Sequence, residues 1–167
     1  PDFLDFGPRI AVCWDDWNPQ AGGGVYFRTD GSSASIVWKG VPQFGGTGIL
    51  NAELVLQPSG QFFALYDSSL NPPSDSCMVG ISAGGGATAN PIDWSAALPT
   101  TVNGGTAHEI LLTGLFDLTN RIHQFTPTSP SATAHQVQLG SLSTCTPGTY
   151  PPLAIAPSSF GVGCPPA

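Results

Sequence analysis

The sequence predicts an all-β protein, an antiparallel β-sandwich with long loops rich in glycine and proline. Short segments in which apolar and polar residues alternate recur at a spacing of roughly ten residues, which is typical of such sandwiches. The 167 residues include 21 glycines and 17 prolines, which interrupt the chain too often for long helices. With 41% hydrophobic residues, among them nine Phe and four Trp, the chain is also too apolar to be disordered.

The first half of the chain gives the clearest strand patterns. In Leu50–Gln57 the residues Leu50, Ala52, Leu54 and Leu56 point to one face of the expected strand. Asp30-Gly31 and Pro58-Ser59-Gly60 are turn sequences between neighbouring segments. We therefore expect six strands in this half: Arg9–Trp14, Val25–Thr29, Ser35–Trp38, Leu50–Gln57, Gln61–Asp67 and Cys77–Ala83.

The second half is less regular. Residues 84–105 read as a long loop, and long loops in compact domains are often functional or packed against something. Ala107–Thr113 fits a helical turn or a strand, while Arg121–Thr126 and Ala134–Leu139 predict a second hairpin. Leu153–Ala156 is a candidate short edge strand. We expect a sandwich domain over residues 1–142 and a Pro/Gly-rich tail over residues 143–167, packed on this domain or on a neighbouring subunit.

The cysteines predict disulfides and an oxidising compartment. The four residues, which form no CxxC pair, are Cys13, Cys77, Cys145 and Cys164. An even number of cysteines in such a chain favours two disulfides and an extracellular or cell-surface location. Three pairings are possible; we favour Cys13–Cys77 with Cys145–Cys164, because the second bridge would staple a tail that has little core of its own.

Composition and motifs exclude several classes of function. Four Lys and Arg residues against eleven Asp and Glu cannot neutralise a phosphate backbone, so we expect no nucleic-acid partner. No apolar run approaches the roughly 18 residues of a membrane span. Gly22–Gly24 and Gly84–Gly86 lack the lysine and the strand–helix context of phosphate loops, and we expect no cofactor.

One sequence resembles a catalytic motif. Gly80–Gly84 spells G-x-S-x-G, the pattern of a hydrolase nucleophile elbow, with Ser82 as its nucleophile. The acids and histidines that follow in hydrolase order are Asp93, Asp117, His123 and His135. An elbow needs a helix after the serine, and the glycines after Gly84 begin a helix poorly. A Ser82 hydrolase is therefore a remote alternative, and we assign no catalytic residue.

Two further groups are candidate binding residues. Asp15, Asp16 and Asn18 supply hard oxygen ligands and are weak calcium candidates, although no regular calcium loop is present and such residues more often cap turns. Trp17 and Trp94 lie in loops and are candidates for an exposed platform on which a sugar ring stacks. For Trp14 and Trp38, which lie in alternating strands, we expect core packing.

Several segments resemble secreted bacterial β-rich proteins with a nidogen-like extracellular domain. The segments that carry the resemblance, in the same order, are Gly7–Asp16, Gly22–Phe27, Ser35–Pro42, Ala52–Tyr66 and Met78–Gly84. Residues 107–139 match more loosely. The resemblance implies an extracellular β-sandwich and no catalytic activity. In that family further strands precede the first segment, whereas only Pro1–Phe6 does so here. Either those strands were trimmed from the sequence or this version does without them, and a sandwich without them would expose sheet edges.

These observations favour a non-enzymatic extracellular structural protein. Few charges oppose contact between copies, and exposed strand edges pair readily with another chain. We expect a self-associating subunit of a filament, sheath or surface layer, joined through strand edges and tails. The candidate strand-donating residues are Phe3, Leu4, Phe6, Leu153 and Ile155. The expected partners are copies of the same chain; the alternative is a carbohydrate-binding or adhesion module that binds glycans.

Overall fold

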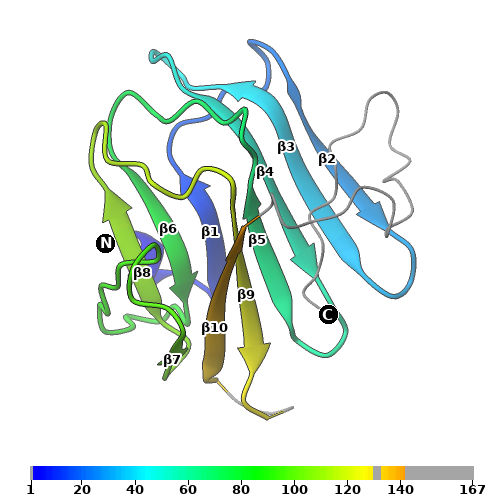
Figure 1. The fold of residues 1–167 in the computed structure, drawn as a ribbon, viewed down its shortest axis with the longest axis vertical. Coiled ribbons are helices and arrows are strands. Elements are labelled where there is room, and N and C mark those ends of the chain that lie inside the picture. Colours follow the sequence, from blue (N-terminus) through cyan, green and yellow to red (C-terminus); the bar gives the residue numbers. More distant parts are fainter. Residues whose placement is uncertain (1, 130–132, 142–167) are drawn as a thin grey trace.

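The structure is a computed structural model that describes residues 2–129 and 133–141. It is an all-β sandwich of two antiparallel sheets, with 48% strand and 2% helix, which confirms the predicted fold class. Figure 1 shows the smaller sheet beside the strands of the larger one. Among the described residues no helix has the length and apolar character that crossing a membrane requires.

The small sheet has the strand order β1-β6-β8. Its strands are β1 (Arg9–Trp14), β6 (Cys77–Ser82) and β8 (Ala107–Leu111). The segment that fitted a helical turn or a strand is therefore a strand, β8. It pairs with β6 along its whole length, because the pairing puts Ala107 and Leu111 into the core beside the inward side chains of β6.

The large sheet has the order β2-β3-β4-β5-β9-β10-β7. Its strands are β2 (Gly24–Thr29), β3 (Ala34–Pro42), β4 (Ile49–Leu56), β5 (Phe62–Tyr66), β9 (Arg121–Pro127), β10 (His135–Ser141) and β7 (Thr100–Val102). Strands β2 to β5 follow one another as hairpins, and β9 returns from the small sheet to pair with β5. In Figure 1, β2 and β3 lie at the side of the molecule away from β6 and β8.

The main core lies between the two sheets. Leu50, Ala52 and Leu54 of β4 point into it, as their alternation predicts, and meet Val79 and Ile81 of β6. Burying such aliphatic side chains contributes about 1.5–3 kcal/mol each. The loop over residues 84–105 is packed against this core, since it supplies Trp94 and the short strand β7.

The N-terminal segment docks on its own chain, and its predicted role as a donated strand stays a prediction. Asp2–Asp5 forms a single helical turn, α1, and Phe3 is buried against Trp14 and His108 on the outer face of the small sheet. The backbone N–H groups of Gly85 and Gly86 donate to the carbonyls of Phe6 and Leu4 at 2.8 and 3.0 Å.

This docking depends on glycine. A side chain at Gly84, which has a φ of 70°, would collide with the Phe6 carbonyl oxygen. Phe3 and Leu4 are thereby held on their own chain, and only Phe6 among the three predicted strand-donating residues of this segment stays exposed. Leu153 and Ile155 lie outside the described residues, as do Cys145 and Cys164.

Candidate functional site

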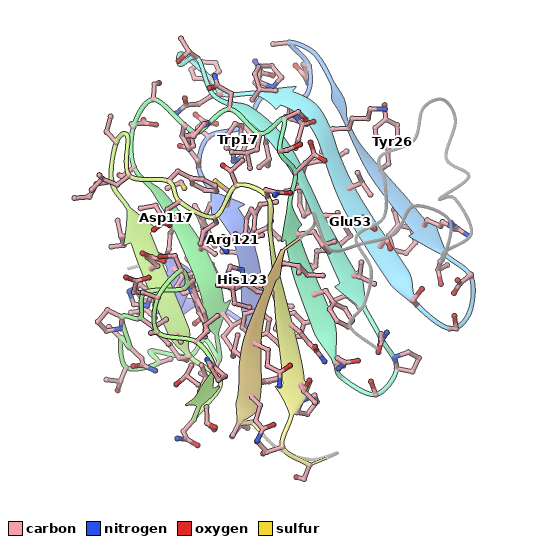
Figure 2. The ribbon with its side chains drawn as sticks, viewed as in Figure 1. Trp17, Tyr26, Glu53, Asp117, Arg121 and His123 are labelled. Carbon is pink, nitrogen blue, oxygen red and sulfur yellow. The ribbon has the colours of Figure 1, made fainter. Side chains whose placement is uncertain are left out.

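A network of aromatic side chains and hydrogen bonds lies between the sheets. Trp94 donates its indole N–H to the Val79 carbonyl at 3.2 Å, and Tyr66 donates its hydroxyl to the Val12 carbonyl at 2.8 Å. Nε2 of His123 lies 3.0 Å from the Trp94 carbonyl oxygen, which can only accept, so this nitrogen carries the proton. Figure 2 shows His123 among the side chains between the sheets.

Burial keeps this network uncharged. It lowers the pKa of His123 to about 4; the charge of Arg121 lowers it further, while the Trp94 carbonyl and Asp117 oppose the shift. Burial also raises the pKa of Tyr66 well above 10. At neutral pH both groups are therefore neutral, and the 1% exposure of His123 leaves no access for a substrate. The network is suited to holding the sheets together, not to proton transfer with a ligand.

Two tryptophan predictions are wrong. Trp94 is fully buried and cannot be a sugar platform, because its loop folds inward and its N–H finds a carbonyl in the core. Trp14 was expected in the core but is 43% exposed. An irregularity in the pairing between Ala11 and Trp14 turns its ring to the side of the small sheet that points away from the large sheet. There Arg9 lies 5.2 Å from the ring centroid. Trp17 is half-buried and donates to the Cys13 carbonyl at 2.8 Å.

Ser82 does not lie in a nucleophile elbow. It is buried at the end of β6, a loop follows it, and its Oγ accepts from the Gly84 N–H at 3.0 Å. The N–H groups of Gly85 and Gly86 are already bound to carbonyls of the N-terminal segment. No amides at this turn are therefore left to stabilise an oxyanion.

Two of the calcium candidates, Asp15 and Asn18, serve as hydrogen-bond acceptors. Asp15 accepts from the Asp16 backbone N–H and from the Gln43 amide, both at 2.8 Å, and burial raises its pKa. Asn18 accepts from the Gln20 N–H at 3.1 Å, as a turn residue does. Over the described ranges no three His, Cys, Asp or Glu residues group in a way that could hold a metal ion.

The first predicted cysteine pair is brought together. Cys13 and Cys77 lie on neighbouring strands, buried, as free thiols. A hydrogen bond with Cys77, together with burial, raises the pKa of the Cys13 thiol well above 9. Since the thiolate is the reactive form, the Cys13 thiol reacts slowly once the protein has folded. Formation of the bridge stays a prediction.

The exposed candidate surface lies at the β2 edge of the large sheet, on the face that carries the core. We name it the β2 overhang; it is formed by Val25, Phe27, Ile36 and Trp38. The pairing of β2 with β3 places Val25 opposite Trp38, and Phe27 opposite Ile36, on the face that carries the core. Ile36 and Trp38 reach the core, but Val25 and Phe27 are 48% and 65% exposed. Among the described strands, β2 is also the last of its sheet, so its far edge faces no described strand.

Sequence reasoning found the strand that forms this surface but not the surface. The three consecutive apolar or aromatic residues of Val25-Tyr26-Phe27 were the available signal, since a strand with one face in water normally alternates with polar residues. Which of these side chains stay exposed depends on how far the small sheet extends over the large sheet. The sequence does not give this overlap.

No protein-family model, curated protein or solved structure matches the chain. The resemblance to nidogen-like domains therefore stays a prediction.

Proposed function

We propose that the protein is a non-enzymatic extracellular structural protein whose copies associate into a filament, sheath or surface layer through the β2 overhang. The observation that carries this proposal is the combination of an apolar surface with a strand edge. Val25 and Phe27 expose apolar area beside the outermost described strand of the large sheet. An edge strand offers its backbone groups to another strand, and the adjacent apolar side chains give the contact free energy.

The low charge density supports the same proposal, although the formal net charge of −7 gives every copy the same sign. Only 9% of the residues are charged, so few like charges oppose contact between copies. Of the two kinds of contact expected from the sequence, the strand edge belongs to the described residues, whereas the C-terminal tail lies outside them. The N-terminal residues are bound to their own chain and are weaker candidates for exchange between copies.

The glycan-binding alternative has less support than the sequence suggested. Of its two platform residues, Trp94 is buried and Trp17 is half-buried with its N–H bound to a carbonyl. Stacking on a sugar needs an accessible ring face.

Sedimentation velocity over a range of protein concentrations tests the proposal. We expect the wild-type chain to associate, and Val25→Asp with Phe27→Asp to raise the dissociation constant at least about tenfold, because two charges would be buried in the contact. Leu112→Asp with Leu115→Asp is the matched control, since both leucines are exposed in a turn after β8. A monomeric wild type at high concentration, or equal effects of the two double variants, would reject the proposal.

A further inference from the structure

The large sheet has a second apolar face, which points away from the small sheet. The strand pairings place Val37, Glu53, Leu65 and Ile122 side by side across β3, β4, β5 and β9. Phe63 and Val55 lie in the neighbouring row. Phe63, Leu65 and Ile122 form a hydrophobic cluster of their own, separate from the core between the sheets. We name this surface the outer face.

The outer face is buried although no described element lies over it. Glu53, Leu65 and Phe63 are 0%, 1% and 2% exposed. The small sheet and α1 both lie on the other side of the large sheet, as the membership of the two clusters shows. Side chains stand roughly perpendicular to a sheet, so a residue on an uncovered face keeps contact with water at its tip. The burial therefore requires a cover from outside the described residues.

Glu53 limits what kind of cover fits. Its carboxyl group lies in the middle of the outer face, as Figure 2 shows on β4, and neither of its oxygens has a hydrogen-bond partner. Burial raises its pKa to about 7, while the nearby Ser35 side chain, which lies outside hydrogen-bonding geometry, and the charge of Arg28 oppose the shift. Basic groups in the cover would lower the pKa of Glu53 below 7, and acidic groups would repel its ionised carboxylate. An uncharged segment fits better, because a carboxyl group with this pKa is neutral for a large part of the time.

The C-terminal segment has the composition and the starting point for this role. The chain leaves β10 at Ser141, directly after Gly140, which pairs with Ile122 at the end of the row. Residues 142–167 contain no Asp, Glu, Lys or Arg, but they contain apolar residues that include Leu153, Ile155, Phe160 and Val162. From β10 to β3 the sheet is four strand spacings wide, about 19 Å, which about six extended residues span.

We propose that residues 142–167 of the same chain cover the outer face of the large sheet and shield Phe63, Leu65 and Glu53 from water. The large sheet is then the middle layer of the molecule. This inference goes beyond the proposed function, because it makes the C-terminal segment an internal part of each subunit and leaves contacts between copies to the β2 overhang on the opposite face.

Photo-crosslinking in the full chain tests the proposal. Benzoylphenylalanine replaces Tyr26 or Gln124, which lie on the outer face. In the control it replaces Phe27 of β2, which lies on the inner face, the side of the large sheet that faces the small sheet. The sample is an equal mixture of ¹⁴N- and ¹⁵N-labelled protein, so mass spectrometry separates adducts within a chain from adducts between chains. We expect adducts within one chain to residues 142–167 from at least one outer-face probe and none from position 27. Adducts between chains, or to other segments only, would overturn the proposal.

The titration of Glu53 gives a second, independent readout. In the full chain, Leu153→Asp with Ile155→Asp is expected to loosen the cover and shift the carboxyl titration of Glu53, followed by NMR, from about 7 toward its ordinary value of 4.5. The control is Leu112→Asp with Leu115→Asp, which adds the same charge elsewhere and leaves the titration unchanged. An equal shift in both variants, or none in either, contradicts the proposal. Neither readout depends on whether copies associate. Failure of this proposal can therefore be distinguished from failure of the proposed function.

Discussion

Along β4, β5 and β9 both faces of the large sheet are apolar and buried, but their buried polar groups differ in hydrogen bonding. On the inner face, Tyr66, Trp94 and His123 each place a polar atom within hydrogen-bonding distance of a backbone carbonyl. On the outer face, the Glu53 carboxyl group is equally buried, and neither oxygen has a partner. Buried polar groups in native proteins are nearly always satisfied. The three central groups of the inner face therefore have partners within the described residues, although Nδ1 of His135, at the β10 side of that face, has none. On the outer face the unpartnered group is a carboxyl at the centre of the sheet.

Strand β5 shows what this difference means for the architecture. All five of its residues, Phe62–Tyr66, are buried, whereas a strand with one face in water alternates between buried and exposed positions. A strand of this kind belongs in a middle layer. The predictions below separate the two faces by their expected effects, beginning with the largest.

Removing the central indole of the inner face is expected to have the largest effect. Trp94→Ala should lower the free energy of unfolding by about 3–5 kcal/mol, because it leaves a cavity and unpairs a core carbonyl. Chemical denaturation at pH 7 measures this loss. Trp14→Ala is the control, because its ring is partly exposed and should cost less than half as much. Equal losses would show that Trp94 does not anchor the sheets.

The cysteine pair beside the inner face should have the next largest effect. If Cys13 and Cys77 are joined, reduction or Cys13→Ser should lower the unfolding free energy by about 2–4 kcal/mol, because the bridge closes a long loop in the unfolded chain. Peptide mapping without reductant checks the bridge directly. Alkylation of both thiols in the unfolded, unreduced protein would contradict it.

The outer face should make stability depend on pH through Glu53. Its pKa is about 7 in the folded protein against 4.5 in the unfolded chain, so its contribution is fully present below pH 4.5 and is lost as the pH rises toward 7. Relative to the wild type, Glu53→Gln should gain up to about 3 kcal/mol between these limits. Denaturation at several pH values measures the difference, and a constant difference would contradict the burial of a carboxyl group.

The inner face should respond in the opposite direction through His123. Its pKa is about 4 in the folded protein against 6.5 when unperturbed, so its contribution is present above pH 6.5 and is lost as the pH falls. Relative to His123→Gln, the wild type should lose about 2 kcal/mol between pH 6.5 and 5. The same titrations measure this loss, and an equal response of both variants to acid would show that His123 is not held neutral.

Much of the fold was predictable because strand signals are local. The limits of β1 and β6 follow from alternation and turn residues to within one residue. Two elements were missed. Strand β7 has only three residues within a loop, and it is a strand because Val137 of β10 lies beside it. The turn α1 is held by carbonyl contacts with a glycine loop far away in the sequence.

The candidate sites were less predictable, since exposure depends on how the sheets overlap. Trp94 lies in a loop and is buried, whereas Phe27 lies in a strand of the core-bearing face and is exposed. The decisive fact in each case is whether a distant segment lies over the residue. Glu53 shows the same limit, because its place in an alternating strand suggests a solvent-facing acid and not a buried one.

The most direct test of this account is sedimentation velocity of three full-length proteins: the wild type, Phe27→Asp, and Leu153→Asp with Ile155→Asp. If copies meet at the β2 overhang and each C-terminal segment stays on its own chain, association should weaken in the Phe27 variant and persist in the tail variant. Association that survives Phe27→Asp but is lost with the tail substitutions would contradict the account.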